Sequence, residues 1–287
     1  MRPFTYVRPD TLDEAVALLA ERGPGARILA GGTDLVIRLR DGSARASVVI
    51  DIKRVPELAP GVRLNADGCL MIGATTTMAE LAAHPLIRRD LAGLAEAAAV
   101  VGSVQIRNRA TLAGNLCNAS PAADTAPSLL VHGALVVACG PGGERRIGLD
   151  DFFVRSGVTT LLPGELVVRI EIPAPVSAIA SAHQRRTRRR GHDLASVTLT
   201  AGVDAAGVTR IAYGSVGPRP VVRVDTTGVL AGRGDEDAQA AVLESVFADA
   251  SPSARSMRAG PEYRLAMLRV LGRRAIASAR TRLAEME

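Results

Sequence analysis

Hydrophobic positions in the first sixty residues switch between helical and strand patterns. Apolar residues from Leu12 to Leu19 recur at the spacing of one helix face, and a capping box begins just before them at Thr11. The runs 27–30 and 48–51 are continuous and apolar enough for buried strands. The pattern predicts a small β-α-β unit whose first strand ends in the turn Gly31-Gly32-Thr33-Asp34.

A second pattern of strands and helices fills the chain up to residue 174. Strand-like residues occur at 69–72, and a second capping box starts at Thr77, ahead of Met78 and Leu81. A helix is predicted over roughly 90–101, and 166–172 is typical of a strand in which Glu171 points outward. Pro173-Ala174-Pro175 ends this strand and is the best candidate domain boundary.

The residues after the boundary predict a smaller α+β domain. The runs 197–203 and 208–216 flank Asp204-Ala205-Ala206-Gly207 as a hairpin. Residues 235–248 and 261–285 have helical patterns, the second with proline at its first position. We therefore expect one domain over residues 1–174, with subdomains of about 1–57 and 58–174, and a C-terminal domain over 175–287.

Composition narrows the class of protein. The chain is 47% hydrophobic and 22% charged, and it contains neither an apolar run long enough to span a membrane nor an N-terminal signal core, so we expect a cytoplasmic protein. Cys69, Cys117 and Cys139 are too widely spaced for a disulfide framework or a local metal-binding run. The net charge of +6 suggests nucleic-acid binding, but only Lys53 among 35 basic residues is lysine and aromatic residues are scarce, which disfavours it.

Two glycine-containing turns, at 30–34 and 111–115, remain as candidates for chemistry. The common nucleotide-binding and hydrolase motifs are absent, and the four histidines lack metal-ligand spacing. Either turn alone is explained by a tight backbone turn. Together they would also let backbone N–H groups approach a pyrophosphate, with the hydroxyls of Thr33 and Thr111 as additional donors.

Five segments carry a resemblance to one family: 28–35, 105–115, 120–124, 151–166 and 190–195. In this order they resemble the FAD-binding medium subunit of the molybdenum hydroxylases, which includes the flavin subunits of xanthine dehydrogenase-like and carbon monoxide dehydrogenase-like enzymes. The resemblance covers essentially the whole chain. It implies an α+β fold, with a two-subdomain FAD-binding unit of the PCMH/vanillyl-alcohol-oxidase type followed by a smaller α+β domain.

The resemblance also implies a division of labour between subunits. FAD would be bound by this chain, whereas molybdopterin would be held by a large partner subunit and two [2Fe–2S] clusters by a small one. We expect a hetero-oligomer, either a heterotrimer or a dimer of heterotrimers, without nucleic acid or a membrane span. The flavin would pass electrons to an external acceptor, with NAD, a quinone and oxygen all open. The first glycine turn has Asp34 where the carbon monoxide dehydrogenase branch tends to have a His-Ser ending, and this difference favours an organic substrate for the complex.

Cofactor-binding residues follow from the resemblance position by position. The two turns would hold the pyrophosphate, and Ser120 and Asp124 would bind toward the ribityl chain or the ring, with a capped turn as their structural alternative. Leu162 would lie against the adenine or flavin edge, and Leu194 would face the isoalloxazine. The full set is Leu29, Ala30, Gly31, Gly32, Thr33, Asp34, Leu35, Val101, Thr111, Ala113, Gly114, Asn115, Ser120, Asp124, Leu162, Arg185 and Leu194.

The arginine run from Arg185 to Arg190 allows two interpretations. It is either a solvated loop, or Arg185 places positive charge beside the flavin N1–O2 edge while the other arginines face a partner. Ala113 replaces the first glycine of a second Gly-Gly pair, so its backbone should not need a positive φ. Leu194 replaces an aromatic residue of some relatives, and the isolated cysteines indicate no iron–sulfur cluster in this chain.

Two alternatives to an electron-transfer subunit remain at this point. A stand-alone FAD-dependent reductase of the same superfamily would need an acid poised over the flavin, for which the sequence offers no obvious candidate. A basic scaffold that binds nucleic acid would contain no flavin and would be colourless.

Overall fold

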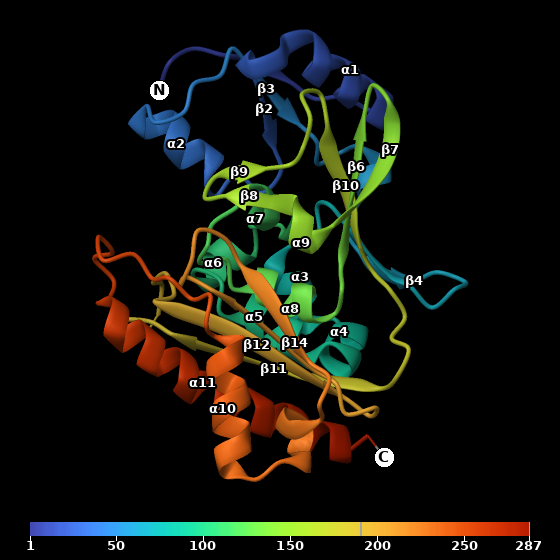
Figure 1. Cartoon of the computed structure of the whole chain (residues 1–287). Helices are drawn as coiled ribbons and strands as arrows, with labels where there is room; N and C mark the ends of the chain where they lie inside the picture. Colours follow the sequence, from blue (N-terminus) through green and yellow to red (C-terminus); the bar gives the residue numbers. More distant parts are fainter. Residues whose placement is uncertain (190, 287) are drawn as a thin grey trace.

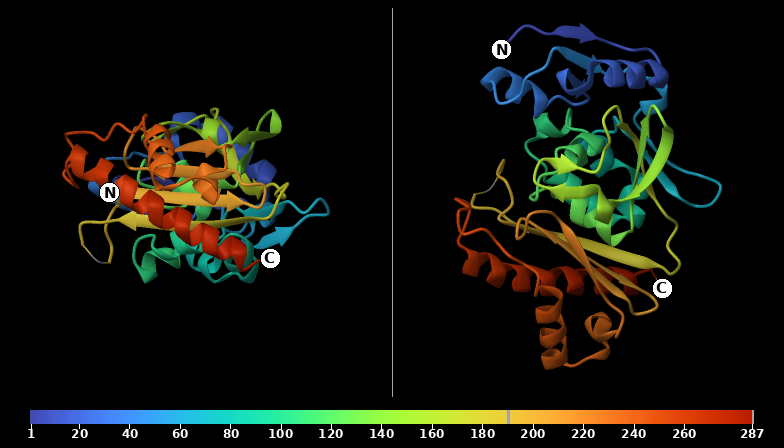
Figure 2. Two further views of the ribbon diagram at one scale, coloured as in Figure 1. Left: turned by 60° about the horizontal axis from the view of Figure 1, so that its bottom comes forward. Right: turned by 45° about the horizontal axis from the view of Figure 1, so that its top comes forward.

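The computed structural model describes residues 1–189 and 191–286, so Arg190 of the arginine run lies outside the described residues. Three sheets follow one another along the long axis of the molecule (Figure 1). The N-terminal sheet lies at the top, a five-stranded sheet with several short helices occupies the middle, and the C-terminal sheet lies at the bottom. The right view of Figure 2 shows the same succession from a further direction.

The N-terminal sheet is parallel, with strand order β1-β3-β2. Helix α1 connects β1 to β2 and begins where the Thr11 hydroxyl accepts a hydrogen bond from the N–H of Glu14, as its capping pattern predicts. Helix α2 connects β2 to β3, which confirms the predicted β-α-β unit. The bounds are β1 Thr5–Val7, α1 Leu12–Arg22, β2 Ala26–Leu29, α2 Leu35–Asp41 and β3 Val48–Asp51, with 3₁₀ turns at Gly23–Gly25 and Pro56–Leu58.

The middle part combines an antiparallel sheet, of strand order β4-β5-β10-β6-β7, with a layer of helices. Thr77 and Glu80 form the predicted capping box at the start of α3. The strands are β4 Val62–Leu64, β5 Leu70–Gly73, β6 Leu135–Gly140, β7 Gly143–Gly148 and β10 Leu166–Ile172, and a small hairpin is formed by β8 Phe153–Arg155 and β9 Val158–Thr159. The helices are α3 Met78–Ala83, α4 Pro85–Asp90, α5 Ala92–Ala99, α6 Val104–Arg107, α7 Leu112–Cys117, α8 Thr125–Val131 and α9 Leu149–Phe152.

Glu171 corrects one expectation from the strand pattern. The residue is 5% exposed rather than directed into solvent. Its carboxylate accepts hydrogen bonds at 2.8 Å from Arg146 on β7 and from Arg169 on β10. Two guanidinium groups therefore balance the charge and cover it, which the alternation of a single strand does not reveal.

The C-terminal sheet is antiparallel and is covered by helices on both faces. The predicted hairpin is present as β12 and β13. Helices α5 and α8 of the middle part pack on one face, while α11 packs on the other with α10 beside it (Figure 1). The bounds are β11 Ile179–Arg186, β12 Val197–Asp204, β13 Thr209–Gly214, β14 Val221–Asp225, α10 Glu236–Val246 and α11 Pro261–Ala284, with a π-type turn at Val229–Arg233.

Helix α11 is the longest helix among the described residues, but its arginines interrupt any apolar stretch. In the described part of the chain, no helix is both long and apolar enough to cross a membrane.

Candidate functional site

A cleft of about 560 Å³ opens where the N-terminal sheet meets the middle part of the molecule. Its walls come from segments that are far apart in the sequence. They are the first glycine turn and the start of α2, the second glycine turn at 110–115, the polar segment 117–124, residues 161–167, and residues 192–194 of the β11–β12 loop. All three parts of the molecule therefore contribute to one site.

The first glycine turn directs backbone donors into this cleft. Strand β2 ends at Leu29, and the chain then turns through Gly32, whose φ of +78° favours glycine. The side chain of Leu29 lies close to this turn, with its Cδ1 atom 2.9 Å from where a Cβ on Gly32 would stand. Among the described residues, the N–H groups of Gly31, Gly32, Thr33 and Asp34 find no protein acceptor. Unpaired N–H groups in a concave turn are suited to an anionic ligand.

The second glycine turn is the start of helix α7. The hydroxyl of Thr111 caps the helix by accepting a hydrogen bond from the N–H of Gly114 at 3.1 Å. A Cβ atom on Gly114 would lie 2.8 Å from that hydroxyl, so glycine keeps the cap intact. Ala113 lies within the helix without a positive φ, as expected. Its own N–H has no acceptor among the described residues.

Side chains also join the two turns. The guanidinium of Arg38 on α2 donates to the side-chain oxygen of Asn118 at 2.5 Å. The amide nitrogen of Asn118 in turn lies 3.5 Å from the carboxylate of Asp34. These contacts hold α2 and the end of α7 on the same side of the cleft.

Most of the predicted cofactor residues line the cleft, and three do not. Leu29 lies close to the first turn. The side chain of Leu162 is 58% exposed. The N–H of Leu162 donates to the Glu165 carboxylate, and this turn directs the neighbouring Leu161 into the cleft instead. Arg185 contacts Asp124 but does not itself line the cleft. Those that line the cleft are Ala30, Gly31, Gly32, Thr33, Asp34, Leu35, Val101, Thr111, Ala113, Gly114, Asn115, Ser120, Asp124 and Leu194.

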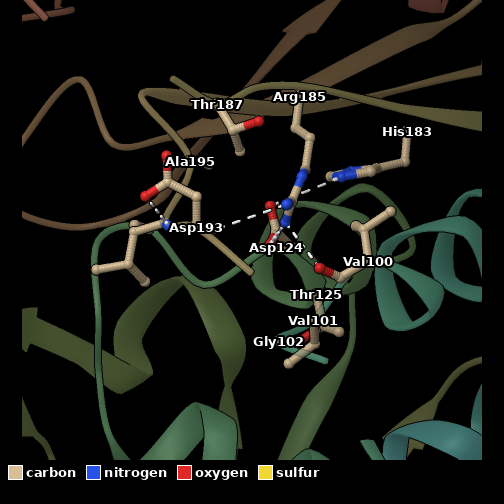
Figure 3. Close-up of polar contacts among 12 residues, drawn as sticks. Val100, Val101, Gly102, Asp124, Thr125, His183, Arg185, Thr187, Asp193 and Ala195 are labelled. Carbon is tan, nitrogen blue, oxygen red and sulfur yellow. Dashed lines mark hydrogen bonds and ion pairs between the residues drawn. The ribbon is translucent and has the colours of Figure 1, made fainter. Parts of the chain in front are cut away.

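Arg185 joins the C-terminal sheet to the wall of the cleft (Figure 3). Its guanidinium donates to the carboxylate of Asp124 at 2.7 Å and to the carbonyl oxygen of Val100 at 2.8 Å. Burial raises the pKa of Asp124 to about 6, although the charge of Arg185 opposes this shift. Ser120 both lines the cleft and caps a local turn by accepting from the N–H of Ala122 at 3.2 Å, so its structural alternative is present as well.

Other described arginines of the run have different partners. Arg186 donates to the Tyr263 hydroxyl at 2.8 Å, and Arg188 pairs with Asp193 at 3.1 Å. The sequence interpretation missed Asn118, Leu161, His192 and Asp193 as cleft residues. Asn118 had a detectable signal, since it follows Asn115 by three residues at the end of the same short helix.

Comparison with known proteins agrees with this architecture. Residues 2–175 match the family model described as the FAD binding domain in molybdopterin dehydrogenase, and residues 182–279 match the CO dehydrogenase flavoprotein C-terminal domain. The chain is 33% identical over 282 residues to the xanthine dehydrogenase FAD-binding subunit of Escherichia coli O157:H7, covering 96% of this chain and 95% of that protein. It is 32% identical over 286 residues to the carbon monoxide dehydrogenase medium chain of Hydrogenophaga pseudoflava, covering 98% of each.

Solved structures give the same result for the fold. Carbon monoxide dehydrogenase from Hydrogenophaga pseudoflava superposes with a TM-score of 0.88 at 30% identity, covering 98% of this chain and 99% of the other. Quinoline 2-oxidoreductase from Pseudomonas putida 86 superposes with a TM-score of 0.84 at 28% identity, covering 98% of each chain.

Proposed function

The chain belongs to the family of FAD-binding medium subunits of the molybdenum hydroxylases, and on this premise we propose that it transfers electrons within such a complex. FAD is the cofactor of this family domain. The flavin supplies the redox chemistry when bound, and the protein supplies binding, orientation and electrostatics. The electrons would come from [2Fe–2S] clusters on a partner subunit and leave for an external acceptor.

One observation carries the assignment of the cleft to FAD. Two turns with free N–H groups and little side-chain bulk face the same cleft, although some eighty residues separate them in the sequence. An elongated ligand with a central pyrophosphate fits this arrangement, because close backbone approach and convergent N–H donors are what a diphosphate requires. The cleft volume of about 560 Å³ also lies within the usual range for small-molecule sites.

The residues of the chain would divide the binding between them. The N–H groups of Gly31 to Asp34 and of Ala113 would hold the pyrophosphate, with the Thr33 and Thr111 hydroxyls beside them. Ser120 and Asp124 would orient the ribityl chain or the ring. Arg185 would not touch the ligand but would position Asp124 through the hydrogen bond that it donates to the Asp124 carboxylate.

The partner arrangement extends the same proposal. A large subunit would hold molybdopterin and hydroxylate the substrate, and a small subunit would carry the two iron–sulfur clusters. The medium chain would join them in a heterotrimer or a dimer of heterotrimers in the cytoplasm. Residues 1–174 would form the FAD-binding domain and residues 175–287 the C-terminal domain. Asp34 in the first turn supports an organic substrate for the complex.

Rapid kinetics on the complex, with and without its FAD, test this electron path. Removing FAD should abolish turnover with the physiological acceptor but leave the substrate able to bleach the iron–sulfur absorbance, because electrons reach the clusters first. If substrate no longer bleaches the clusters in the deflavo complex, the flavin precedes them and the proposed path is wrong. A purified complex that contains no flavin would overturn the assignment of the cleft itself.

A further inference from the structure

Asp124, which lines the cleft, and His183, which does not, face each other with polar atoms left unsatisfied (Figure 3). Asp124 Oδ1 and His183 Nε2 are both buried, and neither has a hydrogen-bond partner among the described residues. The Thr198 hydroxyl oxygen is likewise buried without a partner, and it lies near enough to the Asp124 carboxylate to lower its pKa, but it does not supply a hydrogen to His183 Nε2. Asp124 Oδ1 and His183 Nε2 are 3.9 Å apart. Because buried polar atoms are nearly always paired, two unpaired atoms at this separation require an explanation.

A chain of hydroxyl groups determines which nitrogen of His183 carries its proton. The Ser128 hydroxyl donates to the carbonyl oxygen of Gly93 at 3.0 Å, so it accepts from the Thr200 hydroxyl, 2.7 Å away. Thr200 has then used its own hydrogen and can only accept from His183 Nδ1 at 3.1 Å. In neutral His183 the proton is therefore on Nδ1, and Nε2 is a bare acceptor.

Two acceptors thus face each other with no hydrogen between them. A carboxylate oxygen and a bare imidazole nitrogen repel electrostatically, and one added proton would replace this repulsion with attraction and draw the two atoms together to hydrogen-bond distance. Asp124 also lines the cleft, so a proton can reach the pair from that side. We propose that Asp124 and His183 together bind a single proton, and that this proton sets the charge which the wall of the flavin cleft presents.

The surrounding charges define what this proton changes. Arg185 donates to Asp124 Oδ2, which leaves Oδ1 for the proton. Without the proton, the negative charge of the carboxylate and the positive charge of the guanidinium cancel. Glu96 on α5 accepts from the backbone N–H of His183, and its charge is balanced by Arg282 on α11. With the proton bound, the pair and Arg185 leave one net positive charge at the cleft wall.

The titration range follows from the burial of both groups. Burial raises the pKa of Asp124 to about 6. Burial, assisted by Arg185, lowers the pKa of His183 to about 3, so His183 alone would not bind a proton near neutral pH. Because the groups interact, the single proton belongs to the pair. The positive charge it creates would favour reduced flavin over oxidised flavin, a consequence that rests on the proposed function above.

Histidine ¹⁵N NMR of the full chain without FAD tests the proton site directly. The His183 ring nitrogens, assigned with a His183→Gln variant, should report the binding of one proton between pH 5 and 8. In Asp124→Asn, that response should disappear and His183 should titrate at much lower pH. A matched control is His132→Gln, which removes another histidine that is bonded to Ser181 and should leave the His183 titration unchanged.

The midpoint potential of bound FAD, measured against pH, tests the consequence. Near the NMR midpoint, the wild-type potential should fall more steeply with rising pH than the potential of His183→Gln. The difference between the two slopes should be up to about 30 mV per pH unit, because about 30 mV corresponds to a tenfold change in the equilibrium constant of a two-electron reduction. His183 does not line the cleft, so this variant keeps the residues assigned to FAD.

The outcomes separate this inference from the proposed function. His183 nitrogens that do not respond between pH 5 and 8, or that respond identically in Asp124→Asn, would overturn the proton site even if FAD binds. Equal potential slopes in wild type and His183→Gln would overturn its effect on the flavin. A chain that titrates as expected but binds no FAD would instead refute the proposed function and leave the proton site in place.

Discussion

The α-carbon of Gly31 lies directly against the carbonyl group of Arg109. A Cβ atom at position 31 would be 1.9 Å from the carbonyl oxygen and 2.7 Å from its carbon. Backbone atoms cannot move aside as a flexible side chain can, so only glycine allows the two turns to meet. The close approach of residues 31 and 109 therefore determines the distance between the two rows of N–H donors.

Replacing Gly31 with alanine should separate the two turns. We expect most of the bound FAD to be lost and the free energy of unfolding to fall by about 1–3 kcal/mol, as in other overpacked sites. The FAD-to-protein absorbance ratio and a urea denaturation curve measure the two effects. Gly142→Ala is the control, because a Cβ there meets no atom within 4 Å and should be neutral. Full FAD content in Gly31→Ala would show that the contact is unimportant.

Replacing Gly32 with valine separates backbone strain from ligand contact. Gly32 has a φ of +78° and lines the cleft, whereas Gly42 has a φ of +83° at the other end of α2 with no atom within 4 Å of an added Cβ. Both substitutions should destabilise the protein by about 1–2 kcal/mol through left-handed backbone strain. Gly32→Val should lose somewhat more, because its Cβ would lie 2.9 Å from Cδ1 at the flexible end of the Leu29 side chain. Only Gly32→Val should also lose FAD, measured after purification. Equal FAD contents in the two variants would exclude Gly32 from the pyrophosphate site.

Removing the charge of Arg185 should lower the free energy of unfolding, because the Asp124 carboxylate is buried beside it. Arg185→Met leaves the Asp124 carboxylate without its counter-charge, and we expect a loss of about 3–5 kcal/mol in unfolding free energy. Adding Asp124→Asn should recover part of that loss, because the uncompensated charge is gone. Chemical denaturation of the two single variants and the double variant gives the coupling energy. Additive effects would indicate that the ion pair does not stabilise the fold.

The partly buried imidazole of His132 predicts how stability depends on pH. Burial, followed by the charge of Arg210, lowers the pKa of His132 to about 4, below the value of about 6.5 expected in the unfolded chain. Between these values the unfolded state binds more protons, so stability is present above pH 6.5 and is lost as pH falls toward 4. His132→Gln should reduce the slope of unfolding free energy against pH in this window by about 1.4 kcal/mol per pH unit. Urea denaturation at several pH values checks this, and parallel curves for the two proteins would contradict it.

FAD should be held without a covalent bond. The two turns contain neither histidine nor cysteine, although Cys117 and His192 line the cleft elsewhere. Acid precipitation should release all the yellow colour into the supernatant. If colour stays in the pellet, covalent attachment is present, and Cys117→Ser would show which of the two residues carries it.

Local sequence was sufficient for features that depend on near neighbours. The capping residues Thr11 and Thr77 satisfy N–H groups three positions away, so the two helix starts could be predicted correctly. The hairpin around residues 204–207 and the proline-led helix from Pro261 were predictable for the same reason. The five segments that resemble the family could also be recognised, because their order and spacing are properties of the sequence alone.

Tertiary structure alone decided which distant groups meet. The burial of Glu171 on β10 depends on Arg146 from β7, two strands away in the sheet, and the position of Arg185 depends on Asp124, sixty-one residues away in the sequence. A shift of one position directs Leu161 rather than Leu162 into the cleft, because the turn ending at Glu165 sets the direction of each side chain. The unpaired faces of Asp124 and His183 also arise only when α8 packs on the C-terminal sheet. Such pairings depend on how separate elements pack in space, which the local pattern of a sequence does not specify.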